Sequence, residues 1–259
     1  MLYPALFAYL FLSRLVTGQD YCRYQSSVPL QNATDVPRRF GMVLFRGADP
    51  LDFMGPDEAL FQLGRSYEID RAFIAETLEP ITSEPQLATM NKHNSSTWTQ
   101  ILPTHTFDTA PELDVLFVPG GGGTRSPNLN ATIDFVRATF PKVQYLFTVC
   151  TGAMVAAKAG LLDGKSATTN KQAWNTVVPT GPETNWIGDA RWVVDGNIWT
   201  SSGVAAGIDA MIAFLECTWG HAVTKNVTAE MEYIVHPDSH DDPFAVYPNG
   251  TYIDPNVVS

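Results

Sequence analysis

Short apolar runs alternate with segments of helical spacing along most of the chain, and this alternation is the strongest constraint on its fold. The runs are too short for helices and are typical of strands buried on both faces. Strands that alternate with helices in this way predict an α/β protein with a mostly parallel sheet covered by helices on both sides. The expected strands are 40–45, 67–75, 114–118, 143–149 and 166–169, and the expected helices are 55–63, 130–140, 151–159 and 207–217.

Composition narrows the class of protein. Of the 259 residues, 45% are hydrophobic and 17% are charged, which is enough apolar material for a buried core. The formal net charge is −11, so a nucleic-acid partner would be repelled. We find no internal repeat and no low-complexity linker, and we expect one domain.

The first residues have the pattern of a signal peptide. Residues 2–12 are an apolar run of 11, too short to span a bilayer, and small residues follow at 16–18. We predict a signal peptide over residues 1–18; a signal anchor or an apolar first helix are the alternatives. No later segment is apolar enough to span a membrane, so we expect no membrane association after cleavage.

Glycosylation sequons support export independently. Five Asn-x-Ser/Thr sites without an intervening proline occur in this short chain. Together with the apolar leader they predict a secreted, extracellular glycoprotein. The five asparagines are Asn32, Asn94, Asn130, Asn226 and Asn249.

Three cysteines leave at least one thiol unpaired or in an intermolecular bond. Cys22 lies near the mature N-terminus and Cys217 near the end of a helical stretch, so a bridge between them is a reasonable hypothesis. Connectivity cannot be deduced from sequence alone, but this pairing would leave Cys150 free.

Cys150 follows a predicted strand and precedes a predicted helix. Such a turn presents the side chain at the carboxyl end of the sheet, where ligands bind in open α/β folds. Nearby helix amides favour the thiolate, and the Thr151 N–H can donate to negative charge that develops on a substrate. The arrangement parallels the nucleophile elbow of hydrolases. An inert core cysteine is the alternative.

Two further segments are expected at the same edge of the sheet. Four glycines at 120–123 follow a strand, and an amide of Gly121 or Gly122 could complete an oxyanion hole. The rival interpretations are a phosphate-binding loop, which lacks its usual motif, and a turn without function. Asp49 and Asp52 follow the first strand, and either carboxyl could act as acid or base beside the thiol. Asp52 could equally cap the next helix.

In these segments the chain resembles the ThiJ/PfpI superfamily, also known as the Parkinson-associated deglycase superfamily. That superfamily is itself similar to class I glutamine amidotransferase domains. Within it, the likeness is greatest to isonitrile hydratases and their fungal relatives. The matching pieces occur in the family's order over about residues 40–235, and they are 51–56, 114–121, 149–152, 159–164, 167–169, 195–203 and 206–209.

The resemblance implies a flavodoxin-like fold, a homodimer, and a domain over 40–235 between an N-terminal extension at 19–39 and a C-terminal tail at 236–259. It further implies Cys150 as nucleophile, Asp52 as its acid partner and a role for Thr151 in hydrating a small-molecule isonitrile, with no metal or organic cofactor.

The chain departs from the family's pattern at Asn170, where many relatives have histidine. This disfavours protease-like or amidotransferase chemistry through a Cys–His pair, and also a glyoxalase-like activity. A redox-sensing or ligand-binding protein that uses the same thiol without turnover remains the alternative from another class. The segment 236–242 contains two histidines and three aspartates, and we predict a solvated loop there rather than a metal site.

Overall fold

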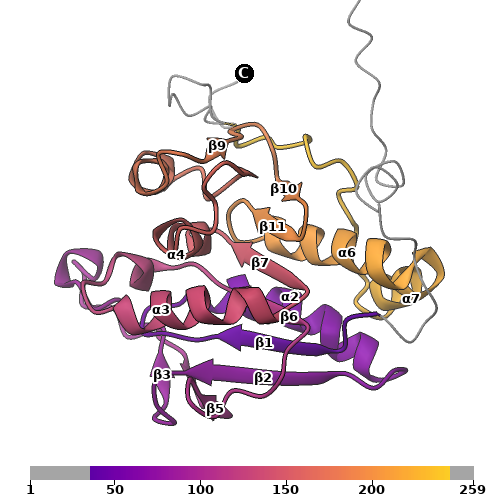
Figure 1. Cartoon of the computed structure of the whole chain (residues 1–259), viewed down its shortest axis with the longest axis horizontal. Coiled ribbons are helices and arrows are strands. Elements are labelled where there is room, and N and C mark those ends of the chain that lie inside the picture. Colours follow the sequence, from indigo (N-terminus) through magenta and orange to yellow (C-terminus); the bar gives the residue numbers. More distant parts are fainter. Residues whose placement is uncertain (1–35, 246–259) are drawn as a thin grey trace, which may run out of the picture.

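A seven-stranded sheet organises residues 36–245, the part of the chain that the computed structural model describes (Figure 1). The strand order is β10-β11-β7-β6-β1-β2-β5, and every neighbouring pair is parallel except β10 and β11. The mostly parallel sheet predicted from the sequence is therefore confirmed. The strands are β1 (Arg39–Val43), β2 (Asp70–Ala75), β5 (His105–Thr106), β6 (Val115–Val118), β7 (Tyr145–Val149), β10 (Trp192–Asp195) and β11 (Ile198–Ser201).

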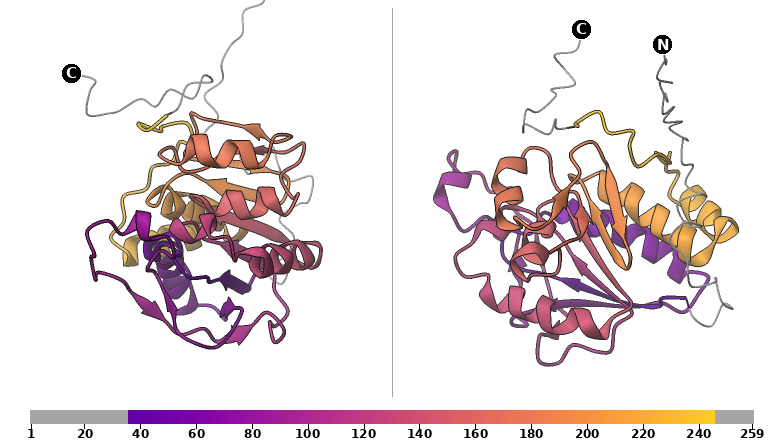
Figure 2. Two further views of the ribbon diagram at one scale, coloured as in Figure 1. Left: turned by 90° about the vertical axis from the view of Figure 1, so that its left-hand side faces the viewer. Right: turned by 45° about the horizontal axis from the view of Figure 1, so that its top comes forward.

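Helices cover both faces of this sheet (Figures 1 and 2). α3 (Asn130–Thr139) and α4 (Gly152–Lys158) lie on one face, while α2 (Pro50–Gly64), α6 (Ala206–Trp219) and α7 (His221–Glu230) lie on the other. Aromatic side chains fill the layer under α6: Phe147 of β7 stacks on Phe117 of β6 at 5.1 Å and meets Phe214 of α6 edge-on. Such contacts add to the hydrophobic stabilisation of the core.

The remaining elements are short. β3 (Ile81–Thr82) pairs with β4 (Gln100–Ile101), and β8 (Ser166–Ala167) pairs with β9 (Asn185–Trp186). The other helical turns are α5 (Trp174–Val177) and the 3-10 segments Ala88–Met90, Gly122–Arg125, Phe140–Lys142 and Val178–Thr180.

The first helix begins five residues earlier than predicted. Asp49 is its N-cap, since its Oδ1 accepts a hydrogen bond from the Leu51 N–H at 3.1 Å, and Pro50 occupies the first turn. Asp52 therefore lies inside the first turn of α2, and the alternative that it caps the helix is excluded.

Four adjacent strands, β11, β7, β6 and β1, run parallel and end at the same edge of the sheet. The segments that follow them are 202–204, 150–151, 119–123 and 44–52. Parallel pairing thus brings together four stretches that are distant in sequence, and this edge carries the candidate site.

Several sequence predictions fall on residues 1–35 or 246–259, which lie outside the described residues. They are the signal peptide, most of the N-terminal extension, Cys22, Asn32 and Asn249. Of the rest, Cys217 is disulfide-bonded and Cys150 is a free thiol. Asn94, Asn130 and Asn226 are all exposed. Within residues 36–245, no helix has the length and apolar character needed to cross a membrane.

Residues 236–242 form a loop with both histidines exposed, as predicted, but two residues of the segment are not solvated. Ser239 and Asp242 are buried, and the described part of the tail packs beside the start of β10, at one edge of the seven-stranded sheet (Figure 1, yellow). The apolar periodicity of this segment is weak, so its packing could not be read from the sequence.

Candidate active site

Cys150 occupies the predicted turn between β7 and α4, and its backbone is strained. Its φ angle is +58°, a left-handed conformation that is uncommon for a residue other than glycine. Hydrogen bonds hold this conformation from both sides: the Cys150 N–H donates to the carbonyls of Ser201 and Ser202, and Thr169 Oγ1 donates to the Cys150 carbonyl at 2.8 Å. The turn is therefore fixed by the neighbouring strand β11 as well as by its own sequence.

Asp52 lies against the thiol and is fully buried. Its carboxyl is close enough to the Cys150 side chain for each group to shift the pKa of the other, and its Oδ2 accepts from the Gly120 N–H at 3.0 Å. Burial, followed by the negative charge of Asp49, raises the pKa of the Asp52 carboxyl to about 8. This carboxyl therefore carries a proton at neutral pH.

One oxygen of Asp52 is available to a bound molecule. Oδ1 is buried and has no hydrogen-bond partner among residues 36–245. A buried polar atom without a partner is destabilising, and such atoms persist where they serve a site. The unpaired oxygen belongs to the same carboxyl that contacts the thiol.

The thiol itself is only 5% exposed. Burial raises the pKa of the Cys150 thiol, and the Asp52 carboxylate raises it further, while the backbone N–H groups of Thr151 and Val204 lower it. The expectation that neighbouring amides favour the thiolate holds for the direction of their effect, but the expected ionised thiol is wrong because burial outweighs the amides. The resting pair is a neutral thiol beside a protonated carboxyl.

The Thr151 hydroxyl ties the elbow to the glycine loop. Thr151 Oγ1 accepts from the Gly121 N–H at 2.9 Å and from Thr124 Oγ1 at 3.0 Å. The prediction that the Gly121 amide forms an oxyanion hole is therefore corrected, since that N–H is already bound to Thr151. No contact of the Gly122 N–H supports or contradicts its predicted role.

Gly120 and Gly121 allow this close approach for different reasons. A Cβ on Gly120 would lie 2.5 Å from the Thr151 nitrogen and 2.9 Å from Asp52 Oδ2. Gly121 has a φ angle of +115°, which L side chains rarely adopt. The glycine loop thus packs against Thr151, the residue after Cys150, and against Asp52.

Sequence reasoning gave no role to Val204, whose N–H points at the sulfur. Val204 has a φ angle of +36°, which is unusual for a β-branched residue. The only signal in the sequence was that residues 201–203 follow a strand, and nothing there singles out a backbone amide. Two amides, those of Thr151 and Val204, therefore face the sulfur.

Asn170, which replaces the histidine of many relatives, lies near this amide pair. A Cβ on Gly203 would come within 2.6 Å of Asn170 Nδ2, and Asn170 Oδ1 accepts from the Ala173 N–H at 2.9 Å. An amide side chain bound in this way can orient a substrate but cannot act as a general base at neutral pH.

A pocket of about 290 Å³ opens beside Val204. Its lining joins the segment after β11 to the start of α6 and to the C-terminal tail, and comprises Asn170, Lys171, Gln172, Arg191, Ser202, Gly203, Val204, Ala205, Ala206, Asp242 and Phe244. A small molecule in this pocket would be next to one of the two amides that face the sulfur.

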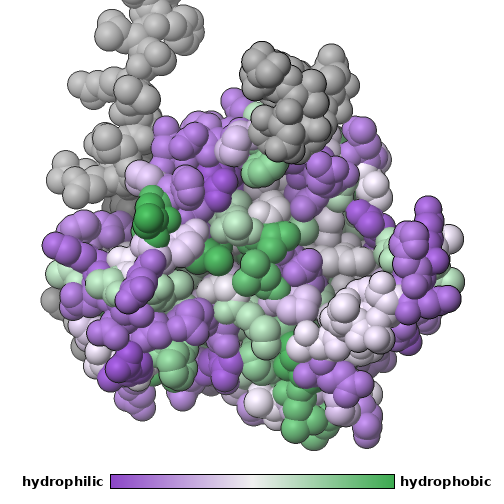
Figure 3. Space-filling model, turned by 180° about the vertical axis from the view of Figure 1, so that it is seen from behind, coloured by the Kyte–Doolittle hydropathy of each residue, from purple (hydrophilic) through white to green (hydrophobic). Residues whose placement is uncertain are grey.

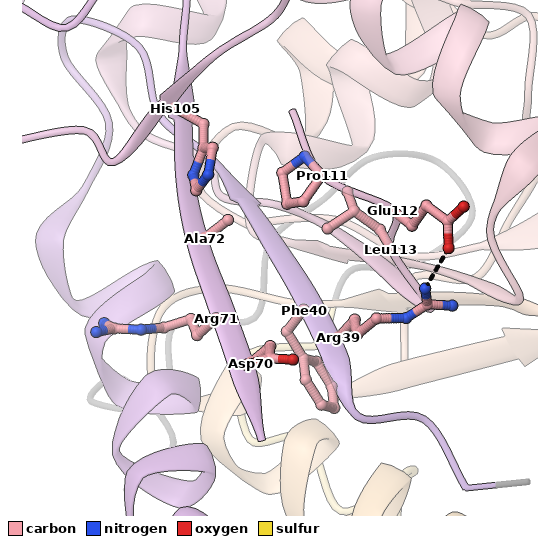
Figure 4. A pocket seen from close by; sticks show the side chains of 9 residues that line it. All are labelled: Arg39, Phe40, Asp70, Arg71, Ala72, His105, Pro111, Glu112 and Leu113. Carbon is pink, nitrogen blue, oxygen red and sulfur yellow. Dashed lines mark hydrogen bonds and ion pairs between the residues drawn. The ribbon is translucent and has the colours of Figure 1, made fainter. Parts of the chain in front are cut away.

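A second pocket, of about 410 Å³, lies away from the thiol (Figure 4). It is lined by the first residues of β1 and β2, which mark the opposite edge of the sheet from Cys150. His105 of β5 faces it across from Pro111, and Arg39 turns instead to Glu112 at 2.7 Å. This pocket contains no nucleophilic side chain, and we do not assign the chemistry to it.

The fold and the site together define a class: a doubly wound α/β protein with a buried cysteine on a strained elbow, faced by a protonated carboxyl. The chain belongs to the DJ-1/PfpI family, whose sequence model matches residues 40–217. The resemblance stated from the motifs is thus confirmed, as is the flavodoxin-like fold similar to class I glutamine amidotransferases.

Relatives of this chain include an enzyme and a regulator. It is 34% identical over 205 residues to the isonitrile hydratase of Pseudomonas putida, which covers 77% of this chain and 80% of that protein. It is 26% identical over 172 residues to the HTH-type transcriptional regulator GbdR of Pseudomonas aeruginosa, covering 62% of this chain and 47% of the regulator. A ThiJ/PfpI family protein from Pseudomonas syringae has a similar structure, with a TM-score of 0.64 and 25% identity over 83% of this chain and 85% of that one.

Proposed function

We propose that this protein is an enzyme that adds water to a small isonitrile, with Cys150 as nucleophile and Asp52 as proton relay. The observation that carries the proposal is the buried contact between the free thiol and the protonated carboxyl. The similarity to isonitrile hydratase over most of both chains supports the same substrate class.

The first step joins the sulfur to the terminal carbon of the isonitrile, R–N≡C. As the S–C bond forms, the thiol proton passes to Asp52 and the proton held by Asp52 passes to the carbon, giving a thioimidate, Cys–S–CH=N–R. A carboxyl that is protonated at neutral pH can donate in this way, and positioned acids of this kind contribute about 10²–10⁴-fold in rate.

Water then adds to the thioimidate carbon. Asp52 accepts a proton from the water and donates one to the nitrogen, giving R–NH–CH(OH)–S–Cys. The C–S bond then breaks, and the hydroxyl proton passes through Asp52 to the sulfur as the hydroxyl becomes a carbonyl. The products are the thiol and R–NH–CHO, so the net reaction is R–NC plus water giving an N-substituted formamide. The Thr151 and Val204 amides stabilise the departing sulfur.

The Cys150→Ala variant tests this proposal. We expect formamide production from benzyl isocyanide, followed by chromatography of the product, to fall at least about 10³-fold, because no other group can form the covalent intermediate. Thermal unfolding and circular dichroism on the same samples show whether the variant is folded. Equal turnover by a folded variant would remove Cys150 from the mechanism.

The same observations weigh against the other functions considered. A redox sensor needs an accessible thiol of low pKa, whereas the Cys150 thiol is buried and its pKa is raised. Asn170 leaves the site without the histidine that glyoxalase-like chemistry would favour. We therefore propose neither function.

We further propose that the protein is exported, glycosylated and dimeric. The exposed sequons Asn94, Asn130 and Asn226 are accessible to glycan in the folded chain. For dimerisation, Leu51, Met54 and Phe61 of α2 are exposed, and their spacing places them on one side of the helix. α2 belongs to the face seen from behind in Figure 3, where apolar surface gathers at the centre.

A further inference from the structure

The described end of the chain, residues 236–245, is tied down across the pocket next to Val204; we call this segment the C-terminal strap. Its first residue donates from the His236 N–H to Asp209 Oδ1 at 3.1 Å. In its middle, the Ser239 carbonyl accepts from the Arg191 N–H at 2.6 Å. These contacts join the strap to α6 and to the start of β10, so the strap has a fixed position at the pocket.

A buried ion pair makes the third attachment. Asp242 of the strap lies 3.3 Å from Lys171 Nζ, and the side chains of both residues are 2% exposed. Lys171 Nζ also donates to Thr168 Oγ1 at 2.8 Å and to the Ala190 carbonyl at 2.7 Å. Separating such a pair would leave a charge buried without compensation, so Phe244, two residues further on, is held at the pocket.

The charged groups around the pocket are paired among themselves. Lys171 pairs with Asp242, and the Arg191 guanidinium donates to Asp209 in α6. Burial lowers the pKa of Lys171 to about 8, which further reduces its positive charge. Among the charged residues of the lining, Arg191 Nε and Asp242 Oδ2 are buried without a hydrogen-bond partner in the described part of the chain, and Asp242 Oδ2 is the oxygen of the ion pair with Lys171. The lining thus offers no free carboxylate and little uncompensated positive charge.

The rest of the lining is uncharged: Asn170, Gln172 and Ser202 are polar, and the apolar part comes from two places in the chain. Val204 contributes beside the amide that faces the sulfur, Ala205 and Ala206 follow at the start of α6, and Phe244 closes the wall from the strap. Uncharged walls of this kind bind apolar groups through the area they remove from water, at about 25 cal/mol per Å².

We propose that this pocket holds the substituent R of the substrate, that R is uncharged and mainly apolar, and that Phe244 of the C-terminal strap determines which substituents are accepted. The inference rests on the proposed isonitrile hydration, and it adds a binding site and a substrate class to it. Because the strap lies beyond residues 40–217, specificity here depends on residues outside the segment that the family model matches.

Three isonitriles and three variants, Ala205→Phe, Phe244→Ala and the control Ala222→Phe, test the inference. The probes are methyl, benzyl and carboxymethyl isocyanide, the last being the anion isocyanoacetate. Ala205→Phe fills the pocket from an exposed position, and Ala222→Phe places the same side chain at an exposed position of α7 as the matched control. Binding of N-benzylformamide to the Cys150→Ala protein, followed by calorimetry with and without Ala205→Phe, gives a readout that needs no turnover.

We expect wild type to have a kcat/KM for benzyl isocyanide at least about tenfold above that for the other two. Ala205→Phe should lower kcat/KM for benzyl isocyanide more than kcat/KM for methyl isocyanide and so abolish the preference for the benzyl group. Ala222→Phe should behave as wild type. Phe244→Ala should reduce the ratio of kcat/KM for benzyl isocyanide to kcat/KM for methyl isocyanide by about tenfold.

Other outcomes separate the two proposals. If wild type prefers isocyanoacetate, Arg191 Nε binds an anionic substituent and the inference is wrong. Equal loss on all three probes in Ala205→Phe would also overturn it. Absence of all turnover in wild type would contradict the proposed function. If the protein still binds N-benzylformamide and Ala205→Phe abolishes that binding, the proposed pocket is supported. Absence of both turnover and binding would refute the function and the pocket.

Discussion

Asp52 and Cys150 illustrate how burial assigns chemical roles to ordinary side chains. A carboxyl and a thiol in water at neutral pH would be an anion and a neutral group. In this site the carboxyl keeps its proton, because desolvation penalises its charge and Asp49 adds a second negative charge nearby. The pair therefore has two protons to move in a reaction that must deliver one to carbon.

The buried carboxyl should also make stability depend on pH. The folded pKa of Asp52, about 8, lies above its ordinary value of 3.8, so between these values the folded protein holds a proton that the unfolded chain has lost. Raising the pH through this window favours unfolding, by at most about 1.4 kcal/mol per pH unit. The stabilising contribution is complete below pH 4 and lost as the pH passes 8.

Asp52→Asn tests this expectation because the amide does not titrate. The free energy of unfolding is measured with urea at several pH values. As the pH rises from 5 to 8, that of the variant should increase relative to that of wild type. Asp108→Asn removes an exposed carboxylate and should keep the wild-type slope. A constant difference between Asp52→Asn and wild type would show that Asp52 ionises normally.

At the scale of elements, the site depends on how closely three loops approach. The glycine loop after β6 lies between the elbow after β7 and the first turn of α2, and Gly120 is where it touches both. The Thr151 hydroxyl then locks the loop through Gly121 and Thr124. The relative position of Cys150 and Asp52 therefore depends on the absence of a side chain at Gly120.

Gly120→Ala should damage stability and activity together. The added methyl group would overlap the Thr151 backbone, which cannot rotate away, so we expect a loss of about 1–3 kcal/mol and a Tm lower by roughly 3–10 °C. Turnover should fall by at least about 10²-fold because the catalytic pair is displaced. The matched control is Gly64→Ala, where the nearest atom would be 3.9 Å from the new Cβ. Wild-type turnover in Gly120→Ala would contradict the proposed packing.

At the scale of the whole molecule, the exposed apolar side of α2 lies on the same helix as Asp52. Phe61 is 62% exposed, unusual for so large an apolar side chain in a helix that otherwise packs on the sheet. A second copy of the chain would cover this surface and would also shelter the turn that carries the acid.

Phe61→Asp should convert the proposed dimer into a monomer. Light scattering coupled to gel filtration of deglycosylated protein should give twice the chain mass for wild type and the chain mass for the variant, since a charge in an apolar interface is unfavourable. Leu102→Asp changes a residue that is 66% exposed in a loop away from α2 and should remain dimeric. A monomeric wild type would refute the dimer.

The sequence by itself determined the class of fold and the position of the cysteine that we propose as nucleophile. Buried strands alternating with helices predict the parallel sheet, because each short apolar run must be covered on both faces. A cysteine between a strand and a small-residue helix can only lie at the carboxyl edge of that sheet. These inferences hold because they depend on local periodicity and on the direction of parallel strands.

Only the tertiary structure decided the electrostatics and the walls of the site. Burial, which no local pattern reveals, raised the pKa of the thiol that helix amides alone were expected to lower. The Val204 amide and the C-terminal strap reach the site through strand order and long-range contacts, and the Gly121 amide is bound by Thr151 instead of facing a substrate. Desolvation and non-local approach depend on the positions of all the surrounding atoms, so they follow from the packed molecule and not from the order of its residues.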